Sequence, residues 1–344
     1  MTERMGARGG AGADATGDSG DARPLSTGAR PVVVVAGPTA SGKSTLALDL
    51  ARARGGVVVN ADAMQCYADL RVLTARPGPA DEAAAPHRLY GTEPDAGRMT
   101  AIRWREAALA EIAAAHAAGR LPILVGGSGL YLKALMEGLP AMPAVPDAVR
   151  SAVAARMAAE GPAALHGWLA SRDPATAARL APGDRQRIAR AVEVLEATGR
   201  PQSDWLAGPA SPPPPGLRFV VAVLDPPRDA LYAACDRRFG AMLAAGAIEE
   251  VRALVARGLA PDLPVMKVIG VPELSAVLAG TMPLADAAAR ARQATRNYAK
   301  RQVTWFRHQM TAAHGSHVTI LRSPPGTASD SLPDLLVRLD RAGE

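Results

Sequence analysis

Residues 37–44, which read GPTASGKS, carry the clearest chemical signal in the chain. Their spacing matches the phosphate-binding pattern G-x-x-x-x-G-K-[ST], in which glycines let successive backbone N–H groups converge on one anion. Lys43 would add a full positive charge, and the Ser44 hydroxyl could ligate Mg²⁺ that screens a diphosphate. The pattern predicts a diphosphate or triphosphate without specifying ATP, and its alternative is a glycine-rich turn with no ligand. The candidate phosphate-binding residues are Gly37, Pro38, Thr39, Ala40, Ser41, Gly42, Lys43 and Ser44.

Two aspartates stand at the ends of predicted strands, where a second chemical group is expected. Many P-loop kinases and hydrolases place an aspartate on Mg²⁺ at the end of another strand. Here the strand that ends at Val125 continues instead into Gly-Gly-Ser-Gly, residues 126–129. Asp225 precedes two prolines, so we interpret it as a turn-initiating residue. Asp62 follows a short buried run, and from the residues alone a helix N-cap is the favoured interpretation.

The elements that must position these residues follow from the hydrophobic pattern. Short apolar runs predict fully buried strands of a parallel sheet at residues 31–36, 57–59, 121–125 and 219–224. Helical patterns lie between these runs, including an alanine-rich helix over residues 101–118, and residues 229–308 are mostly helical. Because strands alternate with helices, the predicted fold class is α/β, with a P-loop NTPase-like core whose parallel sheet is flanked by helices.

A helical insertion domain is predicted in the middle of this core. Residues from about 146 to 200 show helical patterning with no strand-like run, and the proline run that follows indicates a stiff linker. The predicted organisation is a disordered leader over 1–30, a discontinuous core over 31–145 and 217–322, an insertion over 146–208, a Pro-rich linker over 209–216 and a loosely ordered tail over 323–344.

A basic stretch near the C-terminal end indicates a polyanionic partner. The net charge is +6, and the cationic residues are densest over residues 287–308, which contain no acid. Arg292, Arg296 and Lys300 recur at four-residue spacing, so one helical face would be basic, and aromatic residues follow. Lysine and arginine against phosphates, with aromatics on bases, are typical of RNA contact. The alternatives are a solvated basic face and, for the aromatics, core packing.

The composition limits the class of protein. Two isolated cysteines, Cys66 and Cys235, form neither a disulfide framework nor a zinc site, which favours a reducing cytoplasm. No apolar run approaches the roughly 18 residues of a membrane span, and the N-terminus lacks the apolar region of a signal peptide. We therefore expect a cytoplasmic monomer without a membrane partner.

An ordered set of short motifs resembles the tRNA dimethylallyltransferase (isopentenyl-tRNA transferase, IPP transferase) family. Each motif is weak alone, but their joint order and spacing over roughly residues 31–322 is specific. They are GPTASGKS at 37–44, DAMQCY at 62–67, TARP at 74–77, PH at 86–87, GGSGLY at 126–131, DRQRIAR at 184–190 and KRQVTWFR at 300–307. The sequence departs from the family at Ala63, which is usually serine, at Arg76, which is usually lysine, and at Val271, where a Gly-Tyr pair is common.

The resemblance implies transfer of a dimethylallyl group from dimethylallyl diphosphate to the exocyclic amine of the adenosine 3′-adjacent to the tRNA anticodon. Asp62 matches the family's catalytic aspartate, which favours a proton acceptor over the N-cap, and Lys43, Ser44 and Mg²⁺ would stabilise the departing pyrophosphate. Ser128 and Arg150 match positions that contact tRNA. The implied tRNA-binding residues, in the anticodon stem-loop complex, are Asp62, Ala63, Met64, Gln65, Ser128, Arg150, Gln186, Arg187, Ile188, Ala189, Arg190, Lys300, Arg301, Gln302, Trp305 and Arg307.

Two other function classes remain open at this point. A P-loop small-molecule kinase would explain the phosphate loop and Mg²⁺, but it leaves the basic stretch and residues 126–131 without a purpose. A nucleotide-gated RNA-binding module would use both features but would carry out no reaction that depends on Asp62.

Overall fold

The computed structural model describes residues 28–94, 97–310, 317–322, 333 and 336–337, so most of the predicted leader and tail lies outside the described residues. The described chain contains a six-stranded sheet in the order β3-β2-β4-β1-β5-β6. All neighbouring strands pair in parallel. The strands are β1 (Arg30–Ala36), β2 (Val57–Asn60), β3 (His87–Arg88), β4 (Pro122–Gly126), β5 (Leu217–Val223) and β6 (Val318–Arg322).

The structure confirms the four predicted strands and the α/β class, and it adds one strand at each edge of the sheet. β3 has two residues, too few for an apolar run to be recognised in the sequence. β6 follows the long C-terminal helix and pairs with β5 from Phe219 to Val223. Sequence analysis assigned that segment to the core without assigning it an element.

Alternation along β1 divides the core into two layers on opposite faces of the sheet. Val32 and Val34 face one layer, and Val33 and Val35 face the other, all with 0% exposure. Helix α1 (Lys43–Arg54) packs in the second layer. Helices α3 (Ala101–Ala117) and α4 (Gly129–Glu137) pack in the first. A strand that is apolar on both faces needs a helical layer on each side, which explains why this valine run lies at the centre of the sheet.

A second group of helices packs beside the carboxyl end of the sheet. It comprises α10 (Arg228–Ala244), α11 (Ala247–Ala256), the 3-10 turn η2 (Pro264–Lys267), α12 (Val271–Leu278) and α13 (Leu284–Gln309). Their apolar cluster includes residues that follow β2, among them Tyr67 and Leu70, close to the 3-10 turn η1 (Met64–Cys66) and α2 (Pro79–Ala84). Val271, the departure from the family pattern, is buried in this cluster.

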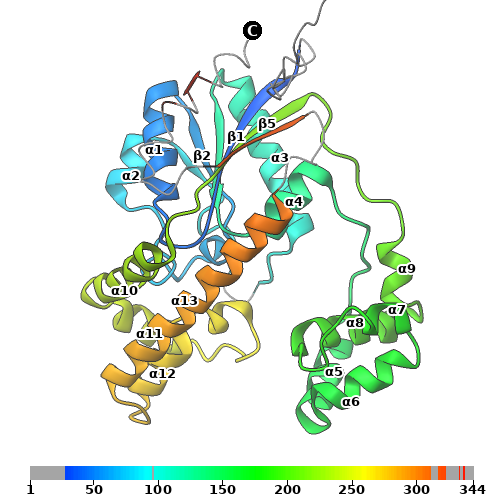
Figure 1. Ribbon diagram of the computed structural model, residues 1–344. Helices are drawn as coiled ribbons and strands as arrows, with labels where there is room; N and C mark the ends of the chain where they lie inside the picture. Colours follow the sequence, from blue (N-terminus) through cyan, green and yellow to red (C-terminus); the bar gives the residue numbers. More distant parts are fainter. Residues whose placement is uncertain (1–27, 95–96, 311–316, 323–332, 334–335, 338–344) are drawn as a thin grey trace, which may run out of the picture.

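Helix α13 joins this helical group to the sheet. Near its start Ala288 and Ala291 pack in the cluster of α10 to α12, whereas Phe306 and Met310 pack in the first core layer under the sheet. Figure 1 shows α13 as the long orange helix that runs from α11 and α12 up to α4. The predicted RNA-contacting stretch, residues 287–308, is therefore one continuous helix that connects this helical group to the sheet.

Every described element between residues 147 and 206 is a helix, as predicted. These helices are α5 (Asp147–Ala159), α6 (Gly161–Ala170), α7 (Pro174–Ala177), α8 (Arg185–Thr198) and α9 (Gln202–Leu206), and they bury an apolar cluster of their own. Figure 1 shows them set apart from the sheet, facing α10 to α13. The two connecting chain segments meet at a bridge between Pro140 and Ala210. None of the helices in the described part of the chain is long and apolar enough to cross a membrane.

Candidate active site

The phosphate-binding loop joins β1 to α1 at the carboxyl edge of the sheet. Gly42 caps α1 with a φ of 87°, a left-handed conformation that favours glycine. A Cβ at Gly37, whose φ is 154°, would lie 2.9 Å from the carbonyl oxygen of Leu224. The first N–H groups of a helix have no intrahelical partner, so the start of α1 offers donors to an anion. The hydroxyl of Ser41 is buried without a hydrogen-bond partner among the described residues, as expected of a group that contacts a ligand.

Lys43 lies in this loop and is held over it. Its Nζ donates a hydrogen bond to the Pro38 carbonyl oxygen at 2.9 Å. Burial lowers the pKa of Lys43 to about 8; the Asp62 carboxylate opposes this shift, and Arg238 adds to it. A diphosphate would reverse the loss of charge, because an anion next to the ammonium favours its protonated form.

Asp62 follows β2 at the same edge, where the chain turns into η1. Its Oδ1 accepts a hydrogen bond from the Met64 N–H at 3.0 Å, but the N-cap of η1 is Ala63, so Asp62 is not the helix N-cap that its residue type suggested. The other carboxylate oxygen has no hydrogen bond to any described residue and is available to a substrate. Below it, the Asn60 side chain accepts from the Asp62 N–H at 2.8 Å and donates to the Asp62 carbonyl at 3.0 Å. These two bonds fix the backbone that carries the carboxylate.

Cys66 is packed beneath the same turn. Asn60 Nδ2 lies 3.4 Å from its Sγ, and the thiol is 3.5 Å from the Asp62 carbonyl oxygen. Burial raises the pKa of the Cys66 thiol to about 12, with Asp62 and Glu93 acting in the same direction. Cys66 and Cys235 are both free and buried, which agrees with the prediction that they form no disulfide.

The Gly-Gly-Ser-Gly run after β4 fits the site because three backbone positions are closely approached. A Cβ at Gly126 would lie 2.1 Å from the backbone of Ala61, and one at Gly127 would lie 2.1 Å from Gln302. A Cβ at Gly129 would lie 2.2 Å from the ring of Trp305. Only glycine therefore allows the strand ends and α13 to meet here.

Ser128, the remaining residue of this run, is tied to the Asp62 turn. Its Oγ accepts a hydrogen bond from the Ala63 N–H at 2.9 Å, and its own N–H donates to the Ala61 carbonyl at 3.2 Å. Because the Oγ acts here as an acceptor, the hydroxyl can still donate one hydrogen bond. Ala63 takes part through its backbone, so its departure from the family's serine leaves this contact in place.

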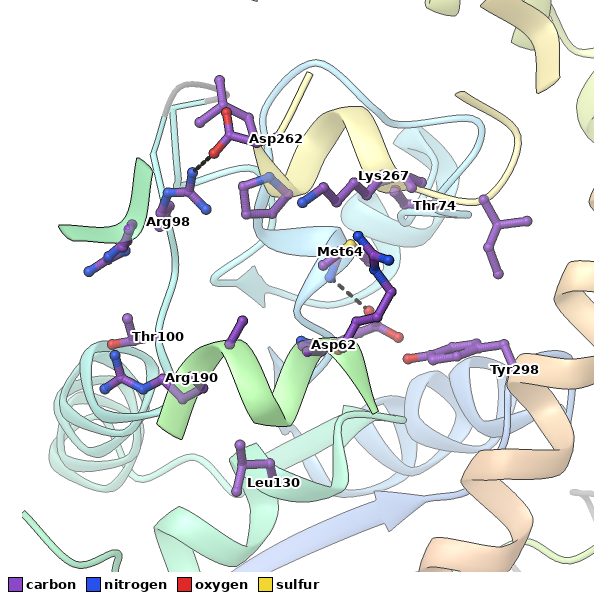
Figure 2. Close-up of a pocket in the computed structure, with 18 of the residues that line it drawn as sticks. Asp62, Met64, Thr74, Arg98, Thr100, Leu130, Arg190, Asp262, Lys267 and Tyr298 are labelled. Atoms are coloured by element: carbon purple, nitrogen blue, oxygen red, sulfur yellow. Dashed lines mark hydrogen bonds and ion pairs between the residues drawn. The ribbon is translucent and has the colours of Figure 1, made fainter. Parts of the chain in front are cut away.

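Sequence analysis missed two residues of the site, Arg238 and Tyr298. Arg238 on α10 donates a hydrogen bond to Thr39 Oγ1 of the phosphate loop. Burial lowers the pKa of Arg238, whereas Cys235 and Asp62 raise it. Figure 2 shows the hydroxyl of Tyr298, on α13, directed toward the carboxylate of Asp62. Burial, and then Asp62, raise the pKa of Tyr298. The only sequence signal for Arg238 is its position on the helix that follows the fourth predicted strand.

These groups open into a cleft of about 1820 Å³ that extends between the sheet edge, α5 and α8, and α10, η2 and α13. Figure 2 shows Tyr298 to the right of Asp62, Arg190 to its left and Leu130 below it, with an ion pair between Arg98 and Asp262. The predicted site residues that line the cleft are Thr39, Asp62, Met64, Arg150, Gln186, Ala189, Arg190 and Arg301. Candidate residues from five separate stretches of the chain therefore line one cleft.

Other predicted residues lie behind or beside the cleft. The rest of the phosphate loop, including Ser44, adjoins the cleft through Thr39. Gln65 donates to the carbonyls of Thr74 and Ala75 at 2.8 and 3.0 Å, which holds the loop next to η1. Arg76 likewise donates to the carbonyls of Tyr67 and Ala68. The predicted residues outside the cleft lining are Gly37, Pro38, Ala40, Ser41, Gly42, Lys43, Ser44, Ala63, Gln65, Ser128, Arg187, Ile188, Lys300, Gln302, Trp305 and Arg307.

The basic stretch on α13 is partly neutralised within the protein. Arg296 donates to both carboxylate oxygens of Asp236 at 2.7 and 2.8 Å. Arg307 pairs with Asp225 through two hydrogen bonds of 2.9 and 3.0 Å, so Asp225 is an ion-pair partner, and no turn follows it before α10 begins at Arg228. Lys300 and Arg301 are exposed, and the guanidinium of Arg301 lies 5.6 Å from the ring of Tyr298. Trp305 packs against the first core layer.

Residues 65–309 match a family model described as IPP transferase. A tRNA dimethylallyltransferase of Rhodospirillum centenum is 62% identical over 284 residues, covering 83% of this chain and 90% of that protein. One of Rhodospirillum rubrum is 56% identical over 285 residues, covering 83% and 87%.

Solved structures agree with these relatives. A tRNA delta(2)-isopentenylpyrophosphate transferase of Staphylococcus epidermidis has a TM-score of 0.62 at 26% identity, covering 91% of this chain and 99% of that one. A eukaryotic dimethylallyltransferase acting on tRNA has a TM-score of 0.70 at 25% identity, covering 90% and 77%. The family model spans more than half of the chain, and relatives above half identity span most of its length, so the chain belongs to the IPP transferase family.

Proposed function

We propose that this protein is an enzyme that transfers a dimethylallyl group from dimethylallyl diphosphate to tRNA. The acceptor is the exocyclic amine of the adenosine 3′-adjacent to the anticodon, and the products are N(6)-dimethylallyladenosine and pyrophosphate. The observation that carries the proposal is the half-used carboxylate of Asp62 in one cleft with the phosphate-loop residue Thr39 and the cation of Arg238.

The diphosphate end of the donor would lie against the phosphate loop. Negative charge develops on the pyrophosphate as the bond between its oxygen and the allylic carbon breaks. The N–H groups at the start of α1, the ammonium of Lys43 and the guanidinium of Arg238 are placed to stabilise that charge. Leu130 is 55% exposed at the cleft and offers the apolar prenyl chain a surface close to Ser128.

The adenine amine would approach from the opposite side of the reacting carbon. Its lone pair is delocalised into the ring, so it attacks poorly until its proton can leave. The nitrogen forms a bond to the allylic carbon while the carbon–oxygen bond breaks, and the amine proton passes to the unpaired oxygen of Asp62. Tyr298 and Ser128 stand beside this carboxylate and its turn and can orient the base by hydrogen bonds.

Mg²⁺ would fit this site through the donor more than through the protein. The described residues contain no group of three His, Cys, Asp or Glu side chains able to hold a metal. Ser44 is exposed at the first turn of α1, where its hydroxyl can complete the coordination of an ion bound to diphosphate oxygens. When bound, the ion would supply charge neutralisation for the departing pyrophosphate.

The tRNA would occupy the part of the cleft that α5, α8 and α13 line. Arg150 and Arg190 come from α5 and α8 on one side, and Arg301 comes from α13 on the other. Cations on two facing walls suit a stem-loop whose two strands both present phosphates. A base within the anticodon loop must leave its stack to react, and it would enter the cleft beside Asp62.

The test is transfer of labelled dimethylallyl diphosphate to unmodified tRNA by the wild-type protein and by Asp62→Asn. We expect the variant to lose about 10²- to 10⁴-fold in transfer rate and to keep its tRNA affinity, because only the proton acceptor is removed. Asp229→Asn, an exposed acid on α10, is the matched control. Equal rates in wild type and Asp62→Asn would refute the proposed role of Asp62, and turnover of labelled ATP without tRNA would favour the kinase.

A further inference from the structure

Gln302 occupies a position that RNA contact does not explain. It is 5% exposed and does not line the cleft, although it lies on the helix that carries Tyr298 and Arg301. Its Oε1 accepts a hydrogen bond from the Thr39 N–H at 2.8 Å, and its Nε2 donates to the Gly127 carbonyl at 2.9 Å. Both ends of one buried amide are thus used, each by a different catalytic loop.

The two loops follow neighbouring strands of the sheet. β1 and β4 are hydrogen-bonded neighbours up to the pair Ala36 and Gly126, after which the chain turns away on both sides. The chain leaves β1 toward β2 and leaves β4 toward β5, on opposite sides of this pair, so the gap between them is the switch point where open α/β sheets bind ligands. Gln302 of α13 hydrogen-bonds to both sides of that gap.

The two hydrogen bonds of Gln302 support residues on both the donor side and the acceptor side of the site. Thr39, whose N–H is anchored by Gln302, receives Arg238 on its hydroxyl, so the amide supports the donor side. Gly127 precedes Ser128, which holds the turn that carries Asp62, so the same amide supports the acceptor side. A Cβ at Gly127 would lie 2.1 Å from the Gln302 amide nitrogen, which shows how little slack the contact has.

We propose that Gln302 is a positioning residue that sets the separation between the pyrophosphate-binding loop and the Asp62–Ser128 pair. This inference rests on the proposed function and extends it, since Gln302 acts through the two loops and touches neither substrate. A glutamine suits the task because one side chain supplies both an acceptor for an N–H and a donor for a carbonyl.

The first test compares Gln302→Met, which keeps the volume and removes both hydrogen bonds, with the wild-type protein. We expect kcat/KM for dimethylallyl diphosphate to fall roughly 10- to 100-fold, with a higher donor KM and a lower kcat, because the half-buried Thr39 N–H and the buried Gly127 carbonyl lose their partners. The dissociation constant for tRNA should stay within about twofold, which also shows that the variant is folded. Gln293→Met, an exposed glutamine on the same helix, should match wild type.

The second test uses Gln302→Glu. Its protonated carboxyl can accept from Thr39 and donate to Gly127, whereas its ionised form presents an acceptor to the Gly127 carbonyl. The donor kcat/KM of this variant, divided by the wild-type value at each pH, should therefore rise as the pH falls from 8 to 5.5. Taking the ratio cancels the pH dependence that the two proteins share. The same ratio for Gln302→Met should be flat.

The outcomes separate this inference from the proposed function. If the wild-type protein does not transfer the dimethylallyl group, the proposed function is wrong, and the positioning role of Gln302 is overturned with it. If wild type is active and Gln302→Met loses tRNA affinity with an unchanged donor KM, Gln302 contacts RNA and the positioning role is overturned. A pH-independent ratio for Gln302→Glu would also overturn it.

Discussion

The protonation of Lys43 gives a prediction whose size can be worked from the structure. Burial lowers the pKa of Lys43 to about 8, so the ammonium that faces the donor loses its proton as the pH rises through that value. About half of the free sites are charged at pH 8 and about one tenth at pH 9. If only the charged form accepts a diphosphate, kcat/KM for dimethylallyl diphosphate should fall about tenfold for each pH unit above about 8.

The measurement is donor kcat/KM at saturating tRNA from pH 6.5 to 9.5. kcat itself should hold to higher pH, because the bound diphosphate raises the pKa of Lys43. In Lys43→Arg the guanidinium stays charged throughout, so the alkaline fall should disappear even though the rate is lower at every pH. Lys133→Arg on α4, where the lysine lies 3.8 Å from Glu137, should keep the wild-type profile. An alkaline fall of equal size in Lys43→Arg would refute the reasoning.

Three further outcomes follow from the same contacts. Gly126→Ala should abolish most transfer in steady-state assays, because its Cβ would lie 2.1 Å from the Ala61 backbone beside Asp62. Wild-type rates in this variant would show that the two backbones are not so tightly packed. Glu250→Gln should lower the free energy of unfolding by about 1–3 kcal/mol in urea titrations, since the carboxylate accepts from three backbone N–H groups, at 2.5, 2.7 and 2.9 Å, on residues 71–73. tRNA affinity should fall steeply between 50 and 200 mM salt through counterion release, and a flat response would remove Arg150, Arg190 and Arg301 from the interface.

The parts of the fold that the sequence predicts are those whose signal is local. The valines of β1 are buried on both faces, so a short apolar run is enough to indicate a central strand. The phosphate loop is likewise one continuous segment with a fixed spacing. β3 has two residues, and no local pattern marks it. Its position depends on pairing with β2, and no neighbouring residues in the sequence indicate that pairing.

The site residues also differ in whether a local motif marks them in the sequence. Asp62 and Ser128 stand in recognisable motifs, whereas Arg238 reaches Thr39 across 199 positions of sequence, with no neighbouring residue to mark it. The charges of α13 are visible in the sequence, but their partners are not, since Asp236 and Asp225 lie on or before another helix. For Gln302, a motif of RNA-contacting residues predicts exposure, and the fold instead buries the amide between two loops.

The two buried thiols bear on what the donor can react with. An allylic carbon that is losing pyrophosphate is an electrophile, and a thiolate captures such carbons more readily than an adenine amine does. Cys66 lies under the Asp62 turn and Cys235 lines the cleft, and burial raises the pKa of both thiols. At neutral pH neither sulfur is ionised, and the Cys66 thiol is also within hydrogen-bonding distance of Asn60 and the Asp62 carbonyl. Burial therefore disfavours the thiolate form, which is the form that an allylic electrophile would alkylate.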